Sequence, residues 1–209
     1  MADKARTHIL MLVSSPLTAD PVAVDRAVEK LTNALRDVAV PATFTVRVAE
    51  PGALSSYLAR RDRPRFAILH YLGHGFKPQD VPEGMLIFES ESGDVRPLNP
   101  LQLRLALNPT NSPEPEFRLA VVMACHSESV AQALYALGIP HIVAVDADET
   151  VYQRSALAFF PGFYKTLLTG GTVQEAFYAG RNAVALDEDL HRLGPETALA
   201  EARKFKLLP

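Results

Sequence analysis

The residues with the clearest potential for chemistry are one cysteine and one histidine that follow separate apolar segments. Cys125 is the only cysteine in the 209-residue sequence, and it lies two residues after the apolar run 119–123. His74 lies 51 positions earlier, two residues after the apolar run 66–72. A cysteine attacks a carbonyl carbon as its thiolate, and a nearby histidine can take the thiol proton and later pass it to the leaving group. The two residues are therefore candidates for a nucleophile and its general base.

The elements that must position this pair are indicated by short apolar runs that alternate with longer segments of helical period. This alternation is typical of βα units with a mainly parallel sheet, in which ligands bind beyond the carboxyl ends of the strands. The sequence thus predicts one α/β domain with His74 and Cys125 at that edge. We expect strands over residues 9–13, 43–48, 66–72, 119–123 and 139–145, a small hairpin over 85–88 and 94–98, a strand-like end over 205–209, and helices over 20–35 (starting at Asp20-Pro21), 51–60, 101–107, 130–137, 151–168, 172–186 and from about residue 195.

The residues next to His74 and Cys125 have two further features that suit thiolate chemistry. Gly75 allows close approach of the backbone to a substrate, and its N–H together with that of Cys125 can form an oxyanion hole. A helix after Cys125, capped by Ser127 or Ser129, is expected to favour the thiolate through its dipole. Both features support the assignment of Cys125 as the nucleophile.

Four polar residues at other strand ends are candidates for a substrate pocket. Ser14 and Ser15 end the first strand, and Asp146 and Asp148 follow the strand 139–145. An acidic pocket would favour arginine or lysine in the substrate. The two aspartates fit a solvated loop or a helix N-cap equally well.

Composition excludes some classes of protein. The formal net charge is -3 and the lysines and arginines are scattered, so we expect no direct binding to nucleic acid. The apolar run 9–13 is too short for a membrane span or a signal peptide, and a single cysteine fits a reducing compartment. A cytoplasmic protein without a membrane partner is expected.

Two segments around the pair resemble the signature motifs of CHAT domains, which are bacterial proteases related to caspases. The first segment is His70-Tyr71-Leu72-Gly73-His74-Gly75, and the second is Ala124-Cys125-His126-Ser127. The separation of 51 residues is close to the value of roughly 50 for a caspase histidine and cysteine. The resemblance extends from about residue 9 to 186 through the opening strand Ile9-Leu10-Met11-Leu12-Val13 with its Ser-Ser-Pro turn, the run Phe163-Tyr164-Lys165-Thr166-Leu167-Leu168, Gly170-Gly171, Glu175-Ala176 and Arg181.

This resemblance implies a caspase-like three-layer α/β/α sandwich with a mainly parallel central sheet. It implies a cysteine endopeptidase that cleaves proteins or peptides through the His74–Cys125 dyad and needs no cofactor. Residues 1–209 are expected to form a single domain that is a fragment of a longer multidomain protein. The family resemblance also implies a fused or associated sensor or repeat region and a role in bacterial antiviral defence or cell death.

Two alternatives to a protease remain open. One is a catalytically silent caspase-like module used for protein interaction. The other is a zinc site, because His70, His74, Cys125, His126 and His141 are all potential ligands, although no pair has the compact C-x-x-C type of spacing. His126 is a poor candidate for the base, because neighbouring side chains on an extended backbone diverge.

Overall fold

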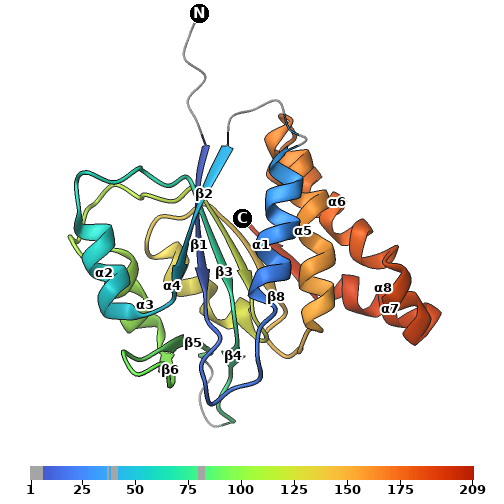
Figure 1. Ribbon diagram of the computed structural model, residues 1–209, viewed down its shortest axis with the longest axis horizontal. Coiled ribbons are helices and arrows are strands. Elements are labelled where there is room, and N and C mark those ends of the chain that lie inside the picture. The colour runs from blue at the N-terminus through green and yellow to red at the C-terminus, as the bar shows by residue number, and fades with distance from the viewer. Residues whose placement is uncertain (1–6, 37, 39–41, 80–82) are drawn as a thin grey trace, which may run out of the picture.

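The centre of the protein is a six-stranded sheet with helices on both faces (Figure 1). The computed structural model describes residues 7–36, 38, 42–79 and 83–209. The strands lie in the order β2, β1, β3, β7, β8 and β9, and β9 alone runs antiparallel to its neighbour within this sheet. This confirms the predicted α/β fold with a mainly parallel sheet. The strands are β1 (Thr7–Val13), β2 (Ala42–Val48), β3 (Ile68–Leu72), β7 (Leu119–Met123), β8 (His141–Val145) and β9 (Phe205–Leu208).

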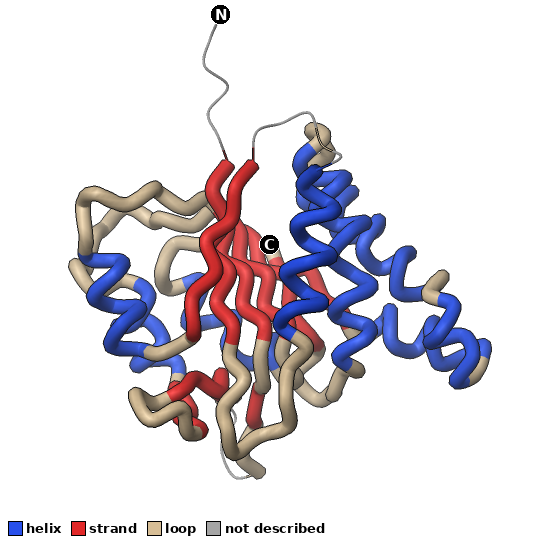
Figure 2. Tube along the Cα trace, viewed as in Figure 1, coloured by secondary structure: helices blue, strands red, loops and turns tan. Residues whose placement is uncertain are grey.

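Two apolar layers explain why the chain forms a three-layer sandwich. Helices cover both faces of the sheet (Figure 2). Successive residues of a strand point to opposite faces, so Ile9 and Met11 join the layer under α1, α5 and α6, whereas Leu10 and Leu12 join the layer under α2, α3 and α4. Parallel strands buried on both faces have few positions for polar residues. The helices are α1 (Val24–Arg36), α2 (Pro51–Ala59), α3 (Pro100–Leu107), the 3₁₀ segment η1 (Ser127–Val130), α4 (Ala131–Tyr135), α5 (Gln153–Leu168), α6 (Val173–Ala185), α7 (Glu188–Leu193) and α8 (Pro195–Arg203).

A second, smaller sheet lies at the carboxyl edge of the main sheet, at the bottom of Figure 1. It contains β4 (Gly75–Phe76), β5 (Met85–Glu89) and β6 (Val95–Leu98), all antiparallel. β5 and β6 form the predicted hairpin. β4 was not predicted, because two residues are too few to show a period in the sequence. It begins directly after His74.

The first helix begins later than the sequence suggested. Asp20-Pro21 is not its start, since α1 begins at Val24. The backbone before it has other partners: the Val22 amide donates to Ser15 Oγ at 3.0 Å, and the Asp20 carbonyl accepts a hydrogen bond from His74. A residue before proline is also kept out of the helical region by the proline ring. These contacts hold residues 20–23 as a loop.

The short helix α7 was also missed, although it has a readable start signal. Asp187 is its N-cap and accepts hydrogen bonds from the amides of Asp189 and Leu190, and acidic residues fill the first turn.

Within the described residues, no helix combines the length and the apolar character needed to cross a bilayer.

Candidate active site

The register of the sheet brings the histidine and cysteine segments together. β3 and β7 are parallel neighbours, and their last residues, Leu72 and Met123, are register partners. His74 and Cys125 each follow two residues later, at the same carboxyl edge, and both are partly exposed. Within the part of the chain that the structure describes, no hydrogen bond joins the two side chains, and such contacts are often longer before a substrate binds. Their catalytic roles stay a prediction that this placement permits.

The two loops touch through Gly75. A β-carbon added to this glycine would overlap the carbonyl oxygen of Cys125, so the contact requires the absence of a side chain. The amide of Ile87 donates to the carbonyl of His74, which makes Gly75 and Leu86 a pair without ladder hydrogen bonds in the alternating antiparallel pattern. The ladder therefore does not use the Gly75 N–H. The predicted oxyanion donor is left available next to Cys125.

The hydrogen bond of His74 determines which nitrogen of its neutral ring carries the proton. Its Nε2 lies 2.8 Å from the carbonyl oxygen of Asp20. A carbonyl can only accept, so Nε2 carries the proton and the lone pair of the neutral ring is on Nδ1. The role of Asp20 is not predictable from the sequence, because the contact uses a backbone atom 54 residues away from His74. The one signal in the sequence is the extended backbone required before Pro21.

The turn that carries Cys125 differs from the expected helix cap. Ser127 is fully buried, and its hydroxyl donates to the Val122 carbonyl at 3.0 Å and accepts from the Val145 amide at 2.8 Å. Ser127 therefore joins β7 to β8 and does not cap a helix. The hydroxyl of Ser129 donates to the carbonyl of His126, and the helix after Cys125 begins with the four-residue segment η1, so the expected dipole contribution is small.

The two serines predicted for the substrate pocket have structural hydrogen bonds at the end of β1. Ser14 is fully buried, and its amide donates to the Leu72 carbonyl at 2.9 Å. Ser15 receives the Val22 amide on its hydroxyl, and its own amide donates to Glu89 Oε1 at 2.8 Å. Ser15 thus holds the segment before α1 that contacts His74, whereas Ser14 holds the end of β1 against β3. Their role in a pocket stays a prediction.

The two aspartates predicted for the pocket have cationic partners. Asp146 lies 3.0 Å from Lys206 Nζ, and Asp148 lies 2.6 Å from Lys77 Nζ. The amide of Asp148 and the side chain of Lys206 hold the pKa of Asp146 below its usual value. A pocket for a basic substrate residue would have to compete with these lysines. The pocket role of the aspartates is likewise still a prediction.

The residues of the zinc alternative are spread over the sheet. His141 is exposed at the amino end of β8, at the opposite edge from Cys125, and His70 is fully buried within β3. His126 donates through Nδ1 to the Ala147 carbonyl at 3.0 Å. In the described ranges, no three His, Cys, Asp or Glu residues are grouped as metal ligands. This arrangement does not favour the zinc alternative.

Burial of His70 should make the protein sensitive to acid. Its Nδ1 lies 2.7 Å from the hydroxyl of Tyr164, and desolvation lowers its pKa from 6.5 to about 3. Below pH 6.5 the unfolded chain binds a proton at His70 that the folded protein does not bind until about pH 3, so the stability contributed by the neutral ring is lost as the pH falls. We expect His70 to lower the free energy of unfolding at pH 5 by about 2 kcal/mol relative to pH 7.5.

Urea denaturation at these two pH values tests this prediction. The double variant His70→Leu, Tyr164→Phe removes the ring together with its hydroxyl partner. Between pH 7.5 and pH 5, its free energy of unfolding should fall by about 2 kcal/mol less than that of the wild type. His141→Leu is the matched control, because His141 is exposed. The same loss in the double variant and in the wild type would disprove the role of His70.

The fold and the candidate site together define a class of protein. A mainly parallel sheet between two helical layers, with histidine and cysteine segments after neighbouring strands, is consistent with a caspase-like fold. The CHAT domain model matches residues 4–198 of the 209-residue chain, and the protein therefore belongs to the CHAT domain family. A comparison with curated proteins found no matching sequence.

Proposed function

We propose that this protein is a cysteine endopeptidase that hydrolyses peptide bonds in protein substrates, with Cys125 as the nucleophile and His74 as the general base and acid. The observation that carries the proposal is the alignment of the two residues beyond register partners of neighbouring strands, together with family membership. The hydrogen bond from His74 to the Asp20 carbonyl supports it further, because it leaves Nδ1 free to accept a proton.

The proposed reaction has two stages. Nδ1 of His74 takes the proton of the Cys125 thiol, and the thiolate sulfur forms a bond to the carbonyl carbon of the substrate. The amides of Gly75 and Cys125 donate to the resulting oxyanion. The carbon–nitrogen bond then breaks as His74 protonates the departing amine, which leaves a thioester. Water, deprotonated by His74, attacks the thioester carbon and releases a carboxylic acid and the free thiol.

The cellular setting is part of the proposal and rests on the family. We propose that the domain acts in the cytoplasm, in bacterial defence or cell death, under the control of a fused or associated sensor or repeat region.

A thiol-reactive peptidyl probe tests the function directly. We expect covalent labelling of the wild type at one site, and we expect Cys125→Ala to abolish it, because the sequence contains no other cysteine. Intact mass and tandem mass spectrometry measure the label. A catalytically silent interaction module is the competing function. It would be indicated by a folded wild type that neither takes up a library of such probes nor cleaves a peptide library.

A further inference from the structure

The carbonyl oxygen of Ala147 lies where three loops of the catalytic edge meet. His126, which follows Cys125, donates to it through Nδ1 at 3.0 Å. Lys77, three residues after His74, places Nζ 3.5 Å from the same oxygen and 2.6 Å from the carboxylate of Asp148. The segment after the nucleophile and the segment after the base therefore use one acceptor on the loop 146–150, which we name the β8–α5 loop.

Backbone contacts strengthen the connection between the β8–α5 loop and the cysteine segment. The amide of His126 donates to the Glu149 carbonyl at 3.2 Å, and the amide of Ala147 donates to Glu128 Oε2 at 3.1 Å. His126 has a φ of 58°, a left-handed conformation that is uncommon for residues with a side chain. A residue keeps such a conformation only where surrounding contacts stabilise it. Here the contacts are made by the backbone amide and by the ring of His126.

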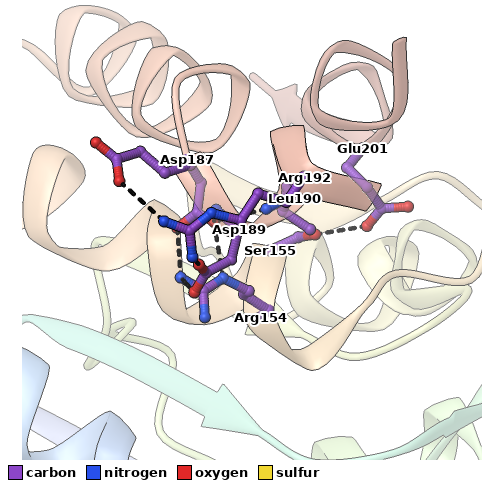
Figure 3. Close-up of polar contacts among 8 residues, drawn as sticks. Arg154, Ser155, Asp187, Asp189, Leu190, Arg192 and Glu201 are labelled. Carbon is purple, nitrogen blue, oxygen red and sulfur yellow. Dashed lines mark hydrogen bonds and ion pairs between the residues drawn. The ribbon is translucent and has the colours of Figure 1, made fainter. Parts of the chain in front are cut away.

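The β8–α5 loop is held in turn by the C-terminal part of the chain. The Asp146 amide donates to the Lys204 carbonyl at 2.8 Å, and Lys204 Nζ donates to the Thr150 carbonyl at 2.7 Å. Just beyond the loop, the buried carboxylate of Glu201 accepts the Ser155 hydroxyl at 2.6 Å at the start of α5 (Figure 3). The loop is thus attached to the helical layer and to β9. It can serve as a fixed reference for the two catalytic segments.

We propose that His126 and Lys77 are positioning residues, which hold the Cys125 and His74 segments in register by binding the Ala147 carbonyl. This inference rests on the proposed thiol protease function. His126 contributes more to this positioning, because its ring is partly buried and joins the cysteine segment directly to Ala147 in the β8–α5 loop. Lys77 contributes less to the positioning, because the carboxylate of Asp148 is 83% exposed and salt screens the ion pair between them.

Variants can separate the ring of His126 from its backbone conformation. His126→Gly and His126→Asn both tolerate the left-handed conformation, yet both remove the imidazole bond to Ala147. For each we expect kcat to fall by about tenfold with KM within about twofold, because the reacting groups are displaced while substrate contacts remain. Lys77→Met should lower kcat about threefold at low salt and less at high salt. Lys165→Met, on the exposed end of α5, is the matched control.

A second readout does not depend on turnover. The rate of alkylation of Cys125 by iodoacetamide is measured at pH 7.5 by intact mass, since the sequence has no other thiol. A well-placed imidazole speeds this reaction by taking the thiol proton, so the rate should fall about fivefold in His126→Gly and His126→Asn. A purely structural role would lower thermal stability without changing this rate.

The outcomes separate the two proposals. A wild-type alkylation rate equal to that of His74→Ala, together with no cleavage, would overturn the protease function and with it the positioning role. A wild-type rate above that of His74→Ala that stays unchanged in both His126 variants, with kcat also unchanged, would overturn the positioning role alone. A lower alkylation rate and a lower kcat in both folded variants are the expected result.

Discussion

Replacing His74 by alanine is expected to slow peptide hydrolysis by about 10²–10⁴-fold, the usual contribution of a general acid and base. The loss should lie in kcat, because in the proposed reaction His74 acts on the proton of Cys125 and on the leaving amine and does not hold the remainder of the substrate. The structure supports this role through the bond from Nε2 to the Asp20 carbonyl, which fixes the ring and leaves Nδ1 to exchange the proton. Steady-state kinetics on a peptide chosen from a cleavage library measure the effect.

The control for this experiment is His141→Ala. His141 is exposed at the amino end of β8 and has no place in the proposed reaction, so this variant should retain wild-type kinetics. Alkylation of Cys125 provides a check on folding and access in His74→Ala, because the thiol should still react at high pH. A folded His74→Ala protein with a kcat close to that of the wild type would exclude His74 as the base.

The part of the site that the sequence predicted is the part that depends on local pattern. Apolar runs before His74 and Cys125 indicated two buried strands, and the alternation of elements indicated that both would end at one edge. The structure confirms the strands as β3 and β7. That β3 and β7 are neighbours was harder to predict from the sequence, because β4, β5, β6 and α3 lie between them in the chain. Only the resemblance to CHAT domains suggested that the ends of the two strands would meet.

The part that the sequence did not predict depends on contacts between distant residues. Ser127 looked like a helix cap, since serine is common there, but the structure uses its hydroxyl between two strands. Glu201 had no recognisable pattern, yet it is 2% exposed and binds the start of α5. Backbone carbonyls such as those of Asp20 and Ala147 leave no mark in the sequence, because every residue carries one.

Substitution of Gly75 by alanine should lower activity about 10²-fold, the loss expected when reacting groups are displaced by about 1 Å. The added β-carbon would overlap the carbonyl oxygen of Cys125, a backbone atom that cannot rotate away as a side chain can. The two loops must separate, which displaces both the His74 ring and the Gly75 N–H from Cys125. Stability should fall by only about 1–3 kcal/mol, since overpacking at one contact is limited in cost. Kinetics and thermal denaturation are measured on the same sample.

Gly52→Ala is the matched control for this glycine substitution. Gly52 lies in the first turn of α2, where the nearest atoms to an added β-carbon belong to the carboxylate of Glu50, the far end of a flexible side chain. The control should be as active and at least as stable as the wild type, because alanine is favoured over glycine in helices. If Gly75→Ala remained fully active, the loops would have to tolerate separation, and an oxyanion hole built from the Gly75 and Cys125 amides would be ruled out. Loss of activity in a folded Gly75→Ala protein, beside an active Gly52→Ala protein, would instead locate the effect in the contact between the two catalytic loops.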